Sequence, residues 1–226
     1  MTGQLHFDLP VRPALGRDAF FVSPSNALAV AMIDGWRDWP GRKLALIGPK
    51  GAGKTHLAHV WAAEAGARII PATDLAQADI PALVTGPVAV EDVPQIAGTA
   101  EAEAALFHLH NLVLAEGHAL LVTGTGSPKT WALTLPDLMS RMEGTQAAIL
   151  NQPDDALLGA VLSKLFADRQ LSVGQDVIAY LVRRIDRSFE AAQRIVARID
   201  AEALARKHAI TRPFVTRLLD SDDTPS

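Results

Sequence analysis

The sequence contains no cysteine and only one tyrosine, and aromatic residues make up just 5% of the chain. The absence of cysteine excludes disulfides, thiolate metal sites and cysteine nucleophiles. No apolar run reaches the roughly 18 residues of a membrane span, and the N-terminus lacks the basic-then-apolar pattern of a secretory signal. We therefore expect a cytoplasmic protein with no membrane partner.

An excess of positive charge is also missing. The 21 lysines and arginines are outnumbered by 25 acidic residues, which gives a formal net charge of −4. This balance argues against a protein whose main activity is to bind nucleic acid through its own phosphate contacts, because such domains are usually basic. The 226 residues, 49% of them apolar, suffice for one substantial core and a small companion domain.

A phosphate-binding loop is the most specific feature that is present. Residues 48–57 read Gly-Pro-Lys-Gly-Ala-Gly-Lys-Thr-His-Leu and satisfy the pattern G-x-x-x-x-G-K-[ST] between an apolar run, 44–47, and a helix-forming stretch. The glycines let backbone N–H groups point at phosphate oxygens, and Lys54 would reach the β- and γ-phosphates. The Thr55 hydroxyl would bind Mg²⁺. The alternative is a glycine-rich turn that binds nothing.

Two carboxylates end the apolar strand predicted at 88–92. Glu91 and Asp92 come at its carboxyl end, where α/β sheets bind their ligands. If the strand continues, the two side chains point to opposite faces, so that one can serve Mg²⁺ and the other the attacking water. Thr123 ends another buried strand, where its hydroxyl could contact the γ-phosphate or its water. The predicted nucleotide contacts are Gly48, Pro49, Lys50, Gly51, Ala52, Gly53, Lys54, Thr55, His56, Phe21, Thr123 and Arg187, with Thr55 and Glu91 as Mg²⁺ ligands.

The order of the remaining elements predicts an α/β domain followed by a helical one. Apolar runs predict strands at 44–47, 68–70, 88–92, 119–123 and 147–150. Helical spacing predicts helices at 54–65 and 99–116, the second with Glu101, Glu103 and His110 off its buried face, and a short helix that ends at 142. Four further helical stretches are predicted at 154–170, 174–185, 188–208 and 211–219. The predicted domains are an extended tail, 1–16, a nucleotide-binding domain, 17–151, a lid, 152–219, and a disordered end, 220–226.

The N-terminal tail carries a short patterned peptide. Gln4 is followed by Leu5, Phe7 and Leu9, whose side chains share one face in an extended chain. Such a pattern suits docking into a groove on another protein. The alternative, that these residues pack on their own domain, is left open.

These features together resemble an AAA+ nucleotide switch, with a five-stranded, mainly parallel sheet flanked by helices and a small all-helical lid. Within that class, residues 48–57 resemble the phosphate loop of the bacterial replication initiator DnaA. Residues 138–142, Leu-Met-Ser-Arg-Met, resemble its arginine-finger box. Residues 186–189 and 210–215 resemble the lid of the Hda family of short DnaA homologues. The resemblance covers roughly residues 4–219.

The resemblance implies a negative regulator of replication initiation. The nucleotide held in that family is ADP, so that we expect ADP or ATP with Mg²⁺ in this chain. Members of the family bind the sliding clamp of the replicase through a motif similar to Gln4, Leu5, Phe7 and Leu9. The clamp-bound protein stimulates hydrolysis of DnaA-bound ATP, and Arg141 would stabilise the γ-phosphate of that neighbouring chain in trans. DNA would be reached only through the clamp. A homo-oligomer is left open.

Two departures from the family pattern predict weak ATP hydrolysis by the chain itself. Glu91 stands where the family has the aspartate of the magnesium site, which lengthens the side chain by one carbon. Glu190 falls where the lid arginine that senses the γ-phosphate is expected, and a carboxylate there would repel phosphate. Arg187 or Arg194, one turn away, could substitute. Two alternatives stay open: an autonomous ATPase that loads helicases or helps transposition, and a DnaA paralogue that anchors another target.

Overall fold

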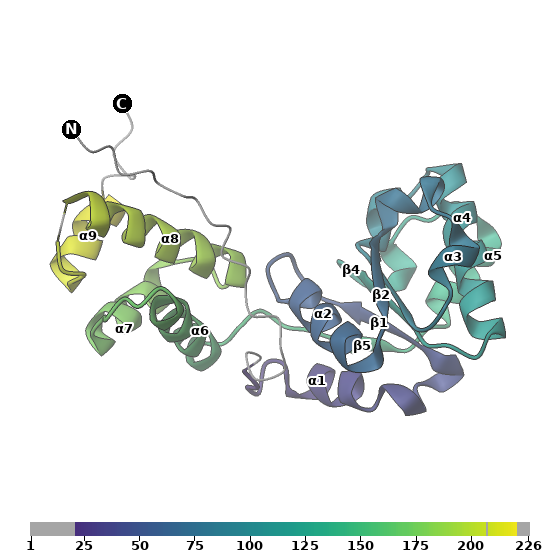
Figure 1. Cartoon of the computed structure of the whole chain (residues 1–226), viewed down its shortest axis with the longest axis horizontal. Helices are drawn as coiled ribbons and strands as arrows, with labels where there is room; N and C mark the ends of the chain where they lie inside the picture. The colour runs from purple at the N-terminus through teal and green to yellow at the C-terminus, as the bar shows by residue number, and fades with distance from the viewer. Residues whose placement is uncertain (1–20, 207, 221–226) are drawn as a thin grey trace.

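A computed structural model of the chain describes residues 21–206 and 208–220. An α/β domain is followed by a separate bundle of helices, and the chain passes from one to the other through residues 150–154 (Figure 1). In the described part of the chain, no helix is both long and apolar enough to cross a membrane. The patterned peptide with Gln4, Leu5, Phe7 and Leu9 lies outside the described residues.

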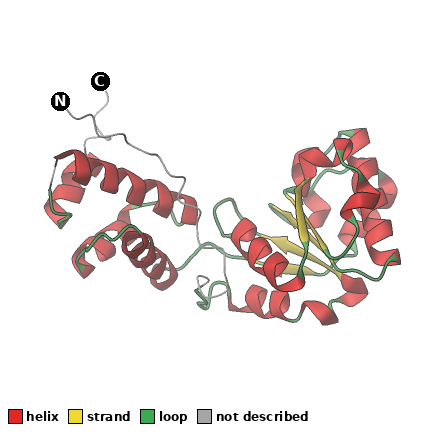
Figure 2. Cartoon of the chain, viewed as in Figure 1, coloured by secondary structure: helices red, strands yellow, loops and turns green. Residues whose placement is uncertain are grey.

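Five parallel strands form the sheet, in the order β2-β3-β4-β1-β5 (Figure 2). The strands are β1 (Lys43–Ile47), β2 (Arg68–Pro71), β3 (Val88–Glu91), β4 (Leu120–Gly124) and β5 (Ala147–Ile149). Because all five run in the same direction, their carboxyl ends share one edge. At that edge, the phosphate loop follows β1, Glu91 ends β3 and Asp92 follows it.

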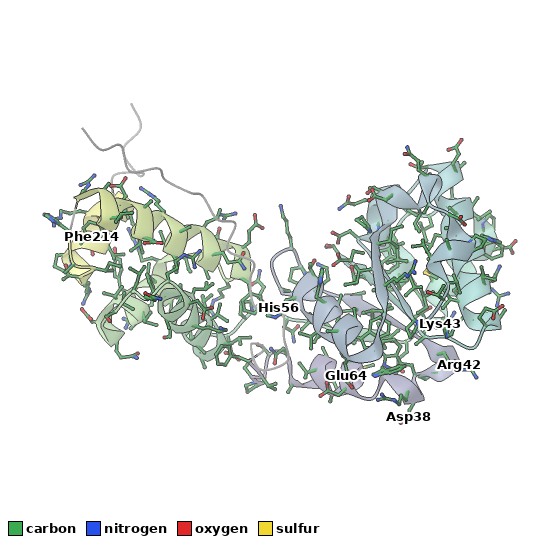
Figure 3. All side chains as sticks on the ribbon, viewed as in Figure 1. Asp38, Arg42, Lys43, His56, Glu64 and Phe214 are labelled. Atoms are coloured by element: carbon green, nitrogen blue, oxygen red, sulfur yellow. The ribbon has the colours of Figure 1, made fainter. Side chains whose placement is uncertain are left out.

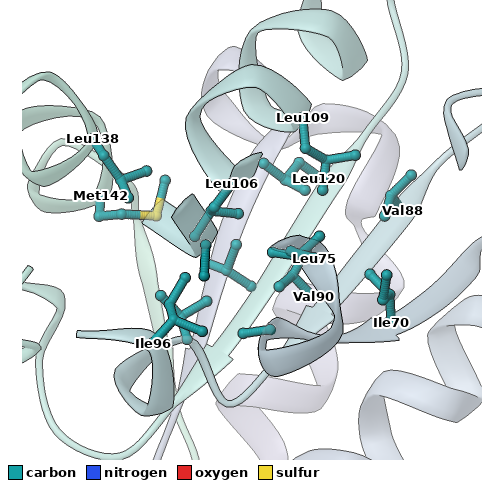
Figure 4. Close-up of a cluster of buried hydrophobic side chains, with 14 of the residues drawn as sticks. Ile70, Leu75, Val88, Val90, Ile96, Leu106, Leu109, Leu120, Leu138 and Met142 are labelled. Atoms are coloured by element: carbon teal, nitrogen blue, oxygen red, sulfur yellow. The ribbon is translucent and has the colours of Figure 1, made fainter. Parts of the chain in front are cut away.

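The sheet carries an apolar core on each face, since alternate side chains of a strand point to opposite sides. One core contains Val90 and Val122 and is covered by α3 (Ile80–Leu83), α4 (Ala100–Ala115) and α5 (Pro136–Glu143) (Figure 4). The other contains Leu46 and Leu121 and is covered by α1 (Ala27–Asp34) and α2 (Lys54–Ala65). Short 3-10 helices lie in the connections: η2 (Trp36–Asp38), η3 (Pro40–Arg42), η4 (Ala72–Gln77), η5 (Val93–Ile96) and η6 (Pro128–Thr130).

The lid consists of α6 (Asp155–Asp168), α7 (Gln175–Arg184), α8 (Phe189–Arg206) and α9 (Arg212–Asp220). It has its own buried apolar cluster, which includes Phe166, Leu181, Val196 and Phe214. The α6 helix begins with a side-chain cap, because Asp154 accepts a hydrogen bond from the Leu157 N–H at 2.8 Å. The lid is thus a second folded unit with a defined start.

Two polar residues of α4 correct the sequence-based prediction. Glu103 and His110 are predicted off the buried face, yet they are only 0% and 2% exposed. Glu103 is buried because backbone N–H groups of Thr134 and Leu135 satisfy its carboxylate. His110 lies with Nε2 3.4 Å from the Nζ of Lys43. Both partners come from other elements, so helical spacing alone does not reveal them.

Candidate functional site

The phosphate loop joins β1 to α2 at the carboxyl edge of the sheet. Gly51 and Gly53 have φ angles of 77° and 97°, in the left-handed region that favours glycine. Among the described residues, no acceptor is bonded to the backbone N–H groups of Gly51, Gly53, Lys54 and Thr55. Four donors are therefore available to an anion at the N-terminal end of α2, as in a phosphate site.

Lys54 lies along this loop and is 8% exposed. Its Nζ donates hydrogen bonds to the carbonyl oxygens of Gly48, at 2.9 Å, and Pro49, at 3.1 Å. Burial lowers the pKa of Lys54, and the nearby carboxylate of Asp92 acts in the opposite direction. The ammonium group is thus held in the loop, within electrostatic range of an acid from β3. Thr55, the next residue, is exposed.

Glu91 and Asp92 do not lie on alternate faces of one continuing strand, as the sequence-based prediction would require. The strand ends at Glu91, and Asp92 adopts a left-handed conformation, φ 53° and ψ 49°. The Asp92 N–H donates to the Thr123 hydroxyl at 3.0 Å, which ties β3 to β4. Glu91 Oε1 is buried and has no hydrogen-bond partner among the described residues. Because such an oxygen requires a partner, Glu91 fits the Mg²⁺ site predicted with Thr55.

The lid contacts the phosphate loop directly. The N–H of Phe189, at the start of α8, donates to the Gly51 carbonyl at 3.0 Å. A Cβ on Gly51 would clash with the Cβ of Ser188, and a Cβ on Gly53 would come within 2.6 Å of the Phe189 ring. Glycine is therefore needed here for close contact with the lid as well as for backbone conformation.

A pocket of about 610 Å³ lies beside the loop and is lined by residues of the core, the linker and the lid. Both cations proposed as substitutes for the lid arginine line it, and each is paired: Arg194 with Glu190 at 2.9 Å and Arg187 with Asp155 at 2.6 Å. The lining residues are Lys50, Gln152, Ile185, Asp186, Arg187, Ser188, Glu190 and Arg194.

Two other predicted contacts lie at the margins. His56 is half-buried, and burial lowers the pKa of His56, as do the neighbouring His59 and Lys164 of α6. Figure 3 shows His56 on the side of the core that faces the lid. Phe21 is exposed, and its carbonyl accepts a hydrogen bond from Asn26 Nδ2 at 2.9 Å. That bond holds its backbone to the start of α1.

Arg141 lies on the last turn of α5 and is exposed. Its carbonyl accepts hydrogen bonds from Lys43 Nζ at 2.9 Å and from the Thr145 hydroxyl at 2.8 Å. Within residues 21–206 and 208–220, no acidic side chain forms an ion pair with Arg141. Lys43 is the first residue of β1, and Gly48 follows the last one. Along the strand, these two residues are therefore about 16 Å apart. Because its carbonyl is bonded to Lys43, which Figure 3 labels, Arg141 is anchored at the end of the sheet opposite its own phosphate loop.

The lid and the whole chain each match known proteins. Residues 155–219 match the family described as the Hda lid domain. The chain is similar to domain III of the Thermotoga maritima replication initiation protein DnaA, with a TM-score of 0.79 and 18% identity over 96% of this chain and 100% of that one. For AMPPCP-bound DnaA from Aquifex aeolicus, the TM-score is 0.66 with 22% identity over 84% and 67% of the chains.

The same fold occurs in a different class of protein. The Thermotoga maritima RuvB Holliday junction branch migration motor has a TM-score of 0.64 and 18% identity, over 86% of this chain and 65% of that one. These likenesses confirm the predicted fold, a parallel five-stranded AAA+ core with a C-terminal helical lid. The lid therefore matches the Hda lid family, and the chain as a whole has a DnaA-like fold.

Proposed function

We propose that this protein is a nucleotide-bound negative regulator of replication initiation, which binds the sliding clamp and stimulates hydrolysis of DnaA-bound ATP through Arg141. The position of Arg141 is the observation that carries the proposal. The side chain is exposed on an anchored helix and lies at the opposite end of the sheet from its own phosphate loop. A cation in this position is suited to a nucleotide on a neighbouring chain, and the DnaA-like fold together with the Hda lid match supports DnaA as that neighbour.

The mechanism assigns different tasks to the two ends of the sheet. At the phosphate loop, the free N–H groups and Lys54 would hold the phosphates of ADP or ATP, and Thr55 with Glu91 would hold Mg²⁺. When bound, Mg²⁺ neutralises charge on the phosphates. At the other end, the Arg141 guanidinium would stabilise the charge that develops on the γ-phosphate of DnaA-bound ATP.

The lid supports ADP rather than ATP as the resident nucleotide. Glu190 lines the pocket beside the loop, and the two lid arginines there are each neutralised by a carboxylate. No net positive charge is thereby directed at a γ-phosphate from this part of the lid. Weak intrinsic hydrolysis follows from this arrangement.

The first test is Arg141→Ala in a reaction that contains DnaA–ATP and DNA-loaded clamp. The variant should lose about 100-fold or more of the stimulated hydrolysis, because an arginine finger supplies a large part of the rate. Arg37→Ala removes another exposed arginine, which lies over the Trp36 ring, and should leave the stimulation intact. Full stimulation by Arg141→Ala would exclude the proposed role.

The second test concerns the clamp. Gln4→Ala and Leu5→Ala should each abolish capture of the protein by immobilised clamp, because their side chains are the proposed docking contacts. Arg141→Ala should still be captured. Clamp binding that survives both tail substitutions would favour the alternative that this chain anchors a different target.

An autonomous ATPase is favoured by one observation, the buried carboxylate oxygen of Glu91 that has no partner in the described part of the chain. It makes the chain's own site suitable for a metal ion. Measuring intrinsic ATP turnover with and without single-stranded DNA separates the two functions, because a helicase loader is expected to respond to the strand.

A further inference from the structure

The carboxylate of Glu103 lies outside the nucleotide site and is completely buried. Its Oε1 accepts hydrogen bonds from the N–H of Gly98 at 2.7 Å and of Thr134 at 3.1 Å. Its Oε2 accepts from the Thr134 N–H at 2.9 Å, the Thr134 hydroxyl at 3.1 Å and the Leu135 N–H at 2.6 Å. Charge-assisted bonds of this kind offset the cost of burying a carboxylate.

These bonds fix the start of α5. Leu135 is the N-cap residue of α5 and has no side chain that could cap it, while Pro136 occupies the first turn. Glu103, from another helix, therefore holds the backbone that leads into α5, and its negative charge lies near the positive end of α5. The start of α5, the helix that carries Arg141, is thus held by a residue that precedes Leu135 by 32 positions in the chain.

The rest of α5 is fixed as firmly. Leu138 and Met142 are 0% and 1% exposed and pack beside Leu106 of α4 (Figure 4). At the last turn, Lys43 Nζ donates to the Arg141 carbonyl at 2.9 Å. Arg141 is therefore carried by a helix held by Glu103 at its start, by the apolar core in its middle and by Lys43 at its end.

The same carboxylate reaches the connection that follows the two acids. Gly98 comes shortly after η5, the 3-10 helix that begins directly after Glu91 and Asp92. Through the Gly98 N–H, Glu103 joins this connection to the start of α5. One buried charge thus links the acid-bearing end of β3 to the helix that carries the finger.

We propose that Glu103 is a positioning residue for Arg141: its carboxylate fixes the start of α5 and so sets the direction in which α5 presents the guanidinium to a neighbouring chain. The role of Arg141 toward a neighbouring chain rests on the proposed function. The effect of Glu103 on the position of α5 is independent of that function, so a separate experiment measures it.

The position of α5 is tested with a spin label. Because the chain has no cysteine, Met139→Cys creates a single attachment site on α5, at a residue that is 40% exposed. Glu103→Gln replaces a carboxylate oxygen with an N–H₂ donor that faces backbone donors. This change should make the label at residue 139 clearly more mobile by electron paramagnetic resonance. A label at Ala63→Cys, on an exposed position of α2, should not respond. Unchanged mobility at residue 139 overturns the proposal.

The activity test uses DnaA–ATP with DNA-loaded clamp. Glu103→Gln should lower the maximal stimulated rate by about tenfold or more and leave the half-saturating concentration within about twofold. Thr134→Ala, which removes a single hydrogen bond, should give a smaller decrease and is available if Glu103→Gln folds poorly. Leu109→Ala is the matched control, because it removes a buried apolar side chain from α4, the helix that carries Glu103. It should lower the stability of the protein. At temperatures below the melting temperature of the variant, its maximal stimulated rate should equal that of wild type.

The outcomes separate the two proposals. Loss of stimulation in Arg141→Ala but full stimulation in Glu103→Gln would overturn the positioning role alone. Full stimulation in Arg141→Ala, with a mobile label in Glu103→Gln, would overturn the proposed function and leave the structural role of Glu103 in place. In the Arg141→Ala background, Glu103→Gln should cause no further loss.

Discussion

At the scale of single residues, three charged side chains form hydrogen bonds with main-chain groups. Lys54 donates to carbonyls of the phosphate loop, Lys43 donates to the Arg141 carbonyl, and Glu103 accepts from backbone N–H groups. A main-chain partner stays in place when a side chain is substituted. Each single substitution therefore leaves the partner group unsatisfied, and its effect reports on one charge.

Lys54→Ala should weaken ADP binding by roughly 30-fold, which corresponds to about 2 kcal/mol for a lost charge-assisted contact. Titration of the protein into a fluorescent ADP analogue measures the affinity. Arg206→Ala, at the far end of α8, is the control and should bind with wild-type affinity. Equal affinity of Lys54→Ala and wild type would mean that the loop does not hold phosphate.

The stability contributed by Glu103 should depend on pH. Burial raises the pKa of Glu103, but hydrogen bonds from Leu135, Gly98 and Thr134 outweigh it and leave the pKa below its ordinary value. Because the folded-state pKa is the lower one, the stabilisation is complete above the ordinary glutamate pKa of about 4.3. It is lost as the pH falls through the folded-state value.

Glu103→Gln should therefore lower the free energy of unfolding by about 1–3 kcal/mol at neutral pH, and the difference from wild type should shrink in acid. Urea unfolding at neutral pH and at several values below the ordinary glutamate pKa measures both quantities. A difference that stays constant across this range would contradict the assignment of the charge.

At the scale of elements, the phosphate loop and the first turn of α8 behave as one contact. Gly53 combines a left-handed φ of 97° with a Phe189 ring that leaves no room for a Cβ. Gly66, which ends α2, has a similar conformation, φ 66°, but nothing lies within 4 Å of its Cβ position. Substitutions at these two glycines therefore distinguish the cost of backbone strain, present at both, from the cost of a clash with the lid, present only at Gly53.

Gly66→Ala should cost about 1 kcal/mol in stability and leave ADP affinity unchanged, because only backbone strain is added. Gly53→Ala should cost more and should also weaken ADP binding, since the ring of Phe189 must move. Thermal unfolding and nucleotide titration of both variants provide the comparison. Equal losses in both would show that the lid contact contributes nothing.

Elements with local signals were predictable from the sequence. The helix at 54–65 has the predicted bounds because its apolar spacing, the loop before it and Gly66 after it are all local. The left-handed turn at Asp92 was not predictable, since its N–H bonds to Thr123, 31 positions away. Within the site, motifs identify Lys54 and Arg141. Lys43 and Glu103 bond to backbone groups of distant elements, and such contacts leave no motif in the sequence.

At the scale of the whole molecule, the pocket beside the loop includes Lys50 of the core, Gln152 of the linker and Arg187 of the lid. A nucleotide held there would contact both folded units. Its binding energy would then stabilise the arrangement of the two units as well as the loop.

ADP at about 100 times its dissociation constant should stabilise the protein by about 2.7 kcal/mol, and so raise the melting temperature by roughly 5–10 °C. Differential scanning calorimetry with and without ADP measures this shift. Lys54→Ala, with its roughly 30-fold weaker affinity, should gain only about 0.9 kcal/mol, or roughly 2–3 °C, at the same concentration. An equal shift in the variant would place the stabilising site elsewhere.

The hydrogen bond from Phe189 to the Gly51 carbonyl makes lid orientation and loop occupancy parts of one equilibrium. A partner that favours one orientation of the lid must change nucleotide affinity by some factor, and thermodynamic reciprocity requires the nucleotide to change that partner's affinity by the same factor. A chain docked on the lid would therefore sense which nucleotide is bound without touching it.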